Sequence, residues 1–127
     1  MTWEIEYTDE FGEWWDTLSE SAQADVAAYV FLLEKKGPNL PFPYSSQIKK
    51  SKHGHMRELR VQHAGKPYRV LYAFDPRRAA ILLIGGAKTG GNKWYTVYVP
   101  IAERLYDEHL KALKEESEQE QRKVDDG

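Results

Sequence analysis

The sequence has 127 residues, with 18 Lys and Arg against 20 Asp and Glu, and it contains no cysteine. This length suits one folded domain, and 41% hydrophobic residues with four tryptophans argue against a disordered chain. The lack of cysteine excludes disulfides and thiolate chemistry, and the lack of a long apolar segment predicts a cytoplasmic protein that does not enter a membrane.

The first third of the chain predicts a strand and two helices. Residues 3–7 alternate apolar and acidic side chains, which is typical of a half-buried outer strand. Thr8 can cap a first helix, and Ser19 or Ser21 can cap a second that ends at Gly37. Together the two helices form a predicted α-hairpin.

The middle of the chain predicts a proline-rich loop and then a sheet. Residues 37–47 contain three prolines and favour a loop. Apolar runs separated by turn residues then predict three antiparallel strands, at residues 56–63, 68–74 and 79–84. The last run, AAILLI, is apolar throughout, which indicates a central strand.

The C-terminal third predicts a flexible glycine-rich loop at residues 85–92, a short strand at 94–99 and a helix that starts at Pro100. Residues 115–127 have no apolar stripe and predict an acidic, disordered tail behind a domain of residues 1–114. The order of elements predicts an α+β fold of two layers, with an antiparallel sheet of four or five strands and a C-terminal helix.

Charges are sorted along the chain. Residues 1–46 hold nine acidic and two basic residues, residues 47–95 hold two acidic and eleven basic residues, and residues 96–127 hold nine acidic and five basic residues. Such an asymmetry favours a face that binds a polyanion, whereas the alternative is a solvated lysine-rich surface.

Several common catalytic sites are poorly supported. There is no G-x-S-x-G motif, and a phosphate loop ending at Lys88 would need glycine where Leu82 and Ala87 stand. His53, His55 and His63 have no carboxylate or cysteine at a recognised metal-ligand spacing. Neither a metal site nor a cofactor is therefore expected, and these histidines could instead contact phosphate or serve as acid–base groups.

Arg69 lies within a predicted strand, on one face with Leu71 and Ala73. An arginine in such surroundings either pairs with a buried carboxylate or points into a site for an anion, because an unpaired buried guanidinium is very costly. Spacing alone leaves both interpretations open. Basic groups beside aromatic rings, typical of sites for single-stranded nucleic acid, surround it in sequence: Lys49, Lys50, Lys52, Lys88, Lys93, Trp94, Tyr95 and Tyr98.

The segments MRELR, GKPYRVLYAFD, AILLIGGAKTG and VPIAERLYDEHL, in this order, resemble the RelE/ParE toxin superfamily and specifically its phage-derived HigB-like branch. The resemblance runs from about Trp3 to Leu113. It implies a toxin of a type II toxin–antitoxin pair, usually a metal-independent, ribosome-dependent mRNA endoribonuclease. It also implies a helix-turn-helix antitoxin as partner, with which the toxin can form oligomers.

Carried over by position, the resemblance assigns catalytic roles to Arg69, Lys88, Tyr95 and Arg60. Tyr98 is the alternative to Tyr95, and Thr89 stands where some relatives have a second basic residue. The neighbouring residues expected to bind RNA are Lys49, Lys50, Lys52, His53, His55, Arg57, Lys93 and Trp94. Two alternatives stay open, a ParE-like inhibitor of DNA gyrase without catalysis and an inactive relative that only binds nucleic acid.

Overall fold

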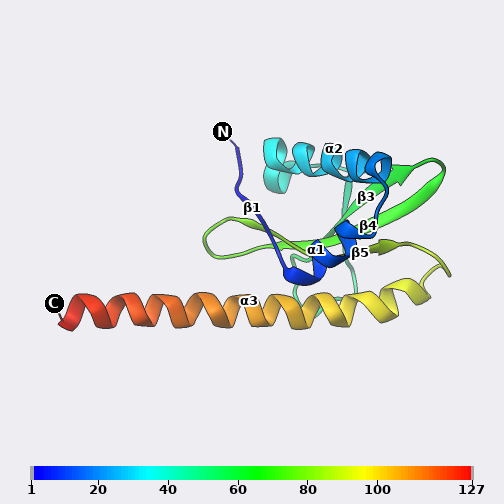
Figure 1. Cartoon of the computed structure of the whole chain (residues 1–127). Coiled ribbons are helices and arrows are strands. Elements are labelled where there is room, and N and C mark those ends of the chain that lie inside the picture. The colour runs from blue at the N-terminus through cyan, green and yellow to red at the C-terminus, as the bar shows by residue number, and fades with distance from the viewer. Residues whose placement is uncertain (1, 127) are drawn as a thin grey trace.

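A computed structural model describes the backbone of residues 2–126 and the side chains of residues 2–125. Figure 1 shows the arrangement of the helices and strands. In chain order they are β1 (Ile5–Tyr7), α1 (Asp9–Asp16), α2 (Glu20–Lys36), the 3-10 turn η1 (Gly37–Asn39), β2 (Ser45–Gln47), β3 (Arg57–His63), β4 (Lys66–Phe74), β5 (Ala80–Ala87) and α3 (Lys93–Asp126).

The five strands form one sheet in the order β1-β5-β4-β3-β2. The pairs β2–β3, β3–β4 and β4–β5 are antiparallel, which confirms the predicted meander. Strand β1 lies at an edge, as predicted, but it runs parallel to β5, so the sheet is mixed. The apolar run in β5 lies in the interior of the sheet, between β1 and β4, and its side chains are buried on both faces.

Helices cover both faces of the sheet. Alternate residues of β4 and β5 point to opposite sides, so Leu71 and Leu83 pack under α3 while Val70 and Leu82 pack under α1 and α2. In Figure 1 the sheet lies between α2 and α3. The α+β class, the α-hairpin and the closing helix are therefore confirmed, whereas the predicted two layers become three because α3 has a sheet face of its own.

Hydrogen bonds confirm the predicted N-terminal caps of α1 and α2. Thr8 Oγ1 accepts from the backbone N–H of Phe11 at 3.0 Å. Of the two serines that could cap α2, Ser19 does so, accepting from the N–H of Ala22 at 3.2 Å. Gly37 ends α2 with a φ of 56°, a conformation that glycine adopts without strain.

Two predicted elements are wrong. Residues 94–99 are helical, and Pro100 lies inside α3 rather than at its start. The alternation in WYTVYV resembles a strand, but Trp94, Tyr98, Ala102 and Leu105 form an i, i+4, i+8, i+11 stripe that packs against the sheet. The proline loop also contains a short strand that the sequence did not predict, β2, which pairs with β3.

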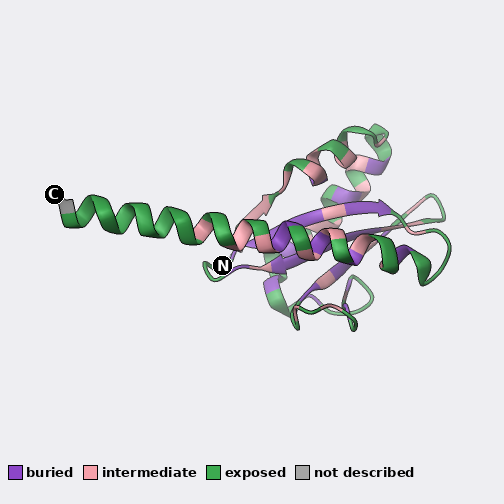
Figure 2. Cartoon of the chain, turned by 90° about the horizontal axis from the view of Figure 1, so that it is seen from below, coloured by how far each residue is buried: buried purple, intermediate pink, exposed green. Residues whose placement is uncertain are grey.

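The second half of α3 extends away from the body of the protein, and its surface is exposed in Figure 2. Disorder was predicted for residues 115–127, but residues 115–126 are helical. Glu, Gln, Lys and Arg are strong helix formers and no Gly or Pro interrupts the segment, so helical propensity prevails without an apolar stripe. Residue 127 lies outside the described residues, and the domain boundary at 114 stays a prediction. None of the helices described in residues 2–126 is long and apolar enough to span a membrane.

Candidate functional site

The sheet brings three charged side chains together on the face that α3 covers. Glu58 and Arg60 are two residues apart on β3, so they point to the same side, while Leu59 between them packs under α2. Arg69 on β4 is the direct cross-strand neighbour of Arg60. Two stiff adjacent strands therefore hold all three side chains.

Glu58 is the centre of this group. The Nε atom of Arg69 lies 3.2 Å from Oε1 of Glu58, and a guanidinium nitrogen of Arg60 lies 3.8 Å from Oε2. Arg69 and Glu58 are each only 4% exposed. Of the two interpretations left open for Arg69, pairing with a buried carboxylate is therefore observed.

The contact between Arg69 and Glu58 is an ion pair without a well-aligned hydrogen bond. Arg69 Nε is buried and close to the carboxylate, yet it has no hydrogen bond of good geometry among the described residues. Another guanidinium nitrogen of Arg69 donates to the backbone carbonyl of Tyr68 at 3.1 Å. Arg69 is thus held in place with part of its hydrogen-bonding capacity unused.

Two further donors fill the coordination of Glu58. The Tyr95 hydroxyl donates to Oε1 at 2.7 Å, and the Ser46 hydroxyl donates to Oε2 at 2.8 Å. The ammonium of Lys88 lies 5.5 Å from the centre of the Tyr95 ring. We refer to these six residues as the Glu58 cluster: Ser46, Glu58, Arg60, Arg69, Lys88 and Tyr95.

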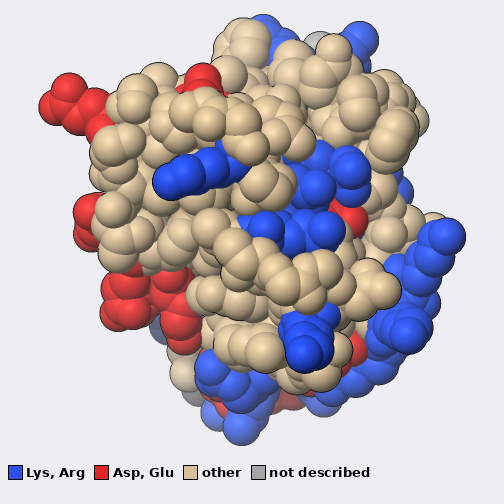
Figure 3. Space-filling model, turned by 90° about the vertical axis from the view of Figure 1, so that its right-hand side faces the viewer, with Lys and Arg blue, Asp and Glu red and all other residues tan. Residues whose placement is uncertain are grey.

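Three cations against one carboxylate make the Glu58 cluster electropositive. The guanidinium of Arg60 reaches its rim, where it lies 5.0 Å from the centre of the Phe42 ring. Figure 3 looks at the side of the molecule where β5 leads into α3 and shows Lys and Arg atoms gathered in a hollow, with Asp or Glu atoms beside them. Such an arrangement favours a phosphate or another anion.

Tyr95 keeps its proton in this environment. Burial raises the pKa of the Tyr95 hydroxyl, and the hydrogen bond to Glu58 and its negative charge raise it further, against a smaller opposing effect of Arg69. At neutral pH the phenol is therefore a hydrogen-bond donor and not a base.

A glycine allows α3 to start directly over the site. Gly86 on β5 is the cross-strand neighbour of Arg69. A Cβ atom at Gly86 would lie 3.0 Å from the ring of Tyr98, one helical turn after Tyr95. The close approach brings Tyr95 within reach of Glu58, while the backbone N–H of Lys88 is fixed by the carbonyl of Pro67 at 2.9 Å.

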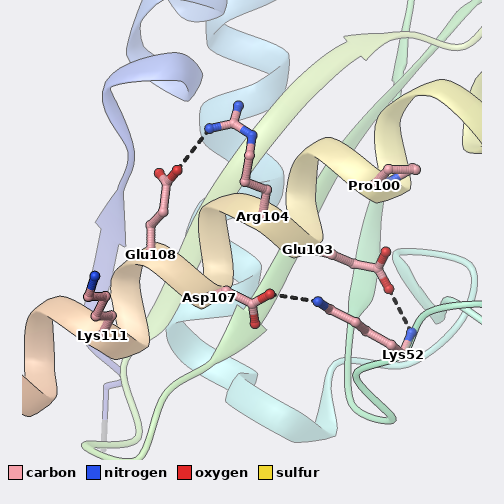
Figure 4. A pocket seen from close by; sticks show the side chains of 7 residues that line it. All are labelled: Lys52, Pro100, Glu103, Arg104, Asp107, Glu108 and Lys111. Carbon is pink, nitrogen blue, oxygen red and sulfur yellow. Dashed lines mark hydrogen bonds and ion pairs between the residues drawn. The ribbon is translucent and has the colours of Figure 1, made fainter.

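Lys52, predicted to bind RNA, contacts α3, and its role in RNA binding stays a prediction. Its ammonium pairs with Asp107 at 2.7 Å, and its backbone N–H donates to Glu103 at 2.6 Å. Figure 4 shows these contacts beside a shallow depression of about 440 Å³ along α3. The carboxylates of Glu103 and Asp107 already have partners, so they attach the loop before β3 to the helix.

The predicted histidines lie in the same contact area. The Nε2 atom of His53 is 2.9 Å from Asp107, and the Nε2 atom of His55 is 3.4 Å from the hydroxyl of Tyr106. Neither contact involves the Glu58 cluster. Among the described residues, no three His, Asp or Glu side chains converge as metal ligands would.

Two more predicted RNA-binding residues have structural contacts. Arg57 lies on the opposite side of β3 from Glu58, where its Nε donates to Ser45 at 3.0 Å. Trp94 is only 4% exposed and stacks on Tyr98 with ring centres 4.3 Å apart. The burial of Trp94 explains it by packing, because a side chain buried in this way cannot stack on a base. Arg57 is partly exposed, and its role in RNA binding stays a prediction.

The remaining predicted residues are exposed. Lys49 and Lys50 lie in the turn after β2, and Lys93 is the first residue of α3. Their role in RNA binding stays a prediction. Sequence reasoning missed Glu58, Ser46 and Phe42. The signal for Glu58 was present, since it is one of two acidic residues between 47 and 95 and shares a strand face with Arg60.

Comparison with known proteins identifies the family. The model of the phage-derived Gp49-like proteins (DUF891) matches residues 13–107. This chain belongs to that family. It is 42% identical over 98 residues to the toxin-family protein HigB3 of Mycobacterium tuberculosis. The aligned region spans 76% of this chain and 84% of HigB3. It is 36% identical over 99 residues to HigB2 of the same organism. That aligned region spans 76% of this chain but only about half, 49%, of HigB2.

Solved structures show the same fold. The E. coli toxin RelE, as a mutant with two arginines replaced by alanine and in the free state, matches with a TM-score of 0.57 and 9% identity, over 76% of this chain and 93% of RelE. The archaeal RelE–RelB complex from Pyrococcus horikoshii OT3 contains a chain that matches with a TM-score of 0.51 and 15% identity, over 68% and 96%. The predicted resemblance to RelE/HigB-type toxins is confirmed, and the chain is a toxin of the type II toxin–antitoxin class.

Proposed function

We propose that this toxin is a metal-independent endoribonuclease that cuts mRNA on the ribosome. The observation that carries the proposal is the Glu58 cluster, in which Arg60, Arg69, Lys88 and Tyr95 lie close together around one carboxylate. These four residues are the ones that the resemblance assigns to catalysis.

The proposed reaction is an internal phosphoryl transfer. The ribose 2′ oxygen attacks the neighbouring phosphorus and loses its proton to a base, while the bond to the 5′ oxygen breaks and that oxygen gains a proton. The products are a 2′,3′-cyclic phosphate and a 5′-hydroxyl. Because the five-coordinate phosphate carries extra negative charge in the transition state, fixed cations accelerate the reaction.

The structure suggests different roles for the cations. Arg60 and Lys88 are partly exposed and suit direct contact with the phosphate. Arg69 is buried, so in the proposal it acts through its unused hydrogen-bonding capacity after a small movement. Glu58 positions Arg69 and Tyr95, because both of its oxygens already accept hydrogen bonds.

Ribosome dependence has support in this geometry. Within the described residues of the Glu58 cluster, the carboxylate is engaged and Tyr95 is protonated, so no group there stands ready to take the 2′ proton. A second component that rearranges the cluster, or supplies the base, would complete the site. The ribosome, which holds mRNA during translation, is the proposed component.

An antitoxin is the proposed protein partner. The structural neighbour from Pyrococcus horikoshii is a RelE–RelB complex, which supports a partner of this kind for the present chain. We propose that the antitoxin is a helix-turn-helix protein encoded beside the toxin, and that the toxin is neutralised by binding it.

The experiment is cleavage of a synthetic mRNA by the purified protein, with and without ribosomes, in the presence of EDTA. The proposal expects cuts that require ribosomes, persist in EDTA and leave a 2′,3′-cyclic phosphate. Intact RNA under all conditions, or cuts that EDTA abolishes, would overturn it.

Both carboxylate oxygens of Glu58 already accept hydrogen bonds, so Glu58 is not free to act as a base. This favours one second candidate function, binding of nucleic acid without cleavage. In that case the Glu58 cluster holds phosphates only, and affinity falls steeply with salt. Intact RNA recovered from a tight, salt-sensitive complex would select this candidate.

A further inference from the structure

A groove opens on the face of the sheet opposite the Glu58 cluster. Helix α1 packs on β5 and α2 packs on β3, so the two helices lie over different strands of the sheet. The groove between them has a volume of about 720 Å³. It is lined by residues of β1, α1, α2 and β5: Ile5, Tyr7, Phe11, Gly12, Trp15, Asp16, Ala27, Val30, Phe31, Glu34 and Leu82.

Large apolar side chains are exposed at this groove. Phe11 and Leu82 at its base are buried, but Tyr7 and Phe31 at its edges are 67% and 55% exposed. Most of the remaining lining residues are apolar or aromatic. A concave apolar surface of this kind on a folded domain typically marks a site where another molecule binds.

The charges of the groove select the kind of occupant. Its lining contains two carboxylates, Asp16 and Glu34, and among the described lining residues there is no Lys or Arg. Lys35 is at the outer rim, with its ammonium 5.2 Å from the centre of the Phe31 ring. Since residues 1–46 hold nine acidic and two basic residues, the surroundings repel RNA and attract a basic partner.

The shape also favours a protein segment. Strand β1 pairs with β5 on one side only, and its other edge is free within the described sheet. One end of β1 is tied to α2, because the N–H of Trp3 donates to the carbonyl of Glu34 at 2.8 Å. The groove thus presents apolar side chains from two helices and an edge strand, the kind of surface on which amphipathic segments bind.

We propose that this groove binds a basic amphipathic segment of a protein partner. Apolar side chains of the segment would cover Tyr7, Phe11 and Phe31, and its Lys or Arg residues would meet Asp16 and Glu34. None of these residues belongs to the Glu58 cluster. Failure of this proposal therefore leaves the proposed cleavage standing, and failure of cleavage leaves the groove proposal standing.

The test uses a labelled synthetic peptide of about 18 residues, long enough for several helical turns, with leucine along one helical face and lysine elsewhere. A scrambled peptide of the same composition, without the leucine face, is the first control. Fluorescence anisotropy with the full chain is expected to show binding of the patterned peptide and at least about tenfold weaker binding of the scrambled one.

Variants locate the binding site. Phe31→Ser and Glu34→Lys should each weaken binding about tenfold, because each removes one kind of contact. Val124→Ser and Glu118→Lys make the same kinds of change on the exposed end of α3 and should bind as the wild type does. Circular dichroism and thermal melting check that all four variants fold.

Three results would overturn the proposal. They are equal binding of both peptides, equal binding by groove and control variants, and a wild-type dimer in sedimentation that Phe31→Ser converts to a monomer. The last result would show that a second copy of the chain occupies the groove.

Discussion

Arg69 on β4 and Glu58 on β3 form an ion pair almost shielded from water, with Arg69 Nε 3.2 Å from Glu58 Oε1. Burial of two charges is costly, so such a pair is weak evidence for stability in itself, but removal of one partner leaves the other charge uncompensated. The pair therefore makes Arg69 a structural residue as well as a candidate catalytic one.

Replacement of Glu58 by Gln should lower the free energy of unfolding by about 3 kcal/mol, because the buried guanidinium of Arg69 loses its countercharge. The double variant Glu58→Gln/Arg69→Met should recover much of that loss. Urea denaturation of the two single variants and the double variant measures this coupling. Additive losses would mean that the two side chains do not stabilise each other.

The exposed cations should separate activity from folding. Arg60→Ala and Lys88→Ala are expected to lower the cleavage rate about 100-fold each while thermal stability stays close to wild type, since these side chains act on the transition state. Arg104→Ala is the matched control, because Arg104 pairs with Glu108 on the surface of α3 and exposed pairs contribute little. A control as slow as the cluster variants would contradict the assignment.

Tyr95 should titrate later than an ordinary tyrosine. Burial and the hydrogen bond to Glu58 raise the pKa of its hydroxyl above 10.0. Spectrophotometric titration of the wild type and Tyr95→Phe should therefore differ only above about pH 10, the ordinary tyrosine value. A difference that appears between about pH 8 and pH 10 would indicate a free phenol, and the role as a protonated donor would be lost.

The environment of Asp75 determines how the stability of the fold should respond to acid. This buried carboxylate accepts from Arg77 at 2.6 Å and from the Nε2 atom of His109 on α3 at 2.9 Å. Burial by itself raises the pKa of Asp75, but these hydrogen bonds outweigh it and hold the pKa below its ordinary value of 3.8.

Because the folded-state pKa of Asp75 is lowered, its contribution to stability is full above pH 3.8 and is lost as pH falls through the folded-state value. Asp75→Asn should be less stable than the wild type at neutral pH, and the gap should shrink in acid. Unfolding curves between about pH 7 and pH 2 give this comparison. A gap that stays constant with pH would show that the charge of Asp75 does not matter.

Much of the fold follows from local patterns in the sequence. The caps at Thr8 and Ser19, the meander and the interior position of β5 each depend on residues close together in the chain. The segment 94–99 resembles a strand because its six residues alternate in character, a pattern that fits the period of a strand as well as that of a helix. Only the partners further along α3 show that the helical stripe prevails.

The candidate site was predictable in part for the same reason. Period two along β3 and β4 places Arg60 and Arg69 on rigid strands, and the family resemblance adds Lys88 and Tyr95. Which carboxylate would pair with Arg69 depends on cross-strand register, which a single sequence does not reveal. Likewise, Lys52 and His53 form a basic run in the sequence, yet contacts with the distant Asp107 direct them to α3.

The Glu58 cluster is proposed to cut mRNA. The most direct test of this proposal is a map of mRNA 5′ ends in cells that express the wild type, the variant Arg60→Ala/Lys88→Ala or the control Arg104→Ala. New 5′ ends and growth arrest are expected with the wild type and the control, and neither with the double variant. Growth arrest by the wild type without new 5′ ends, or the same new ends with the double variant, would contradict it.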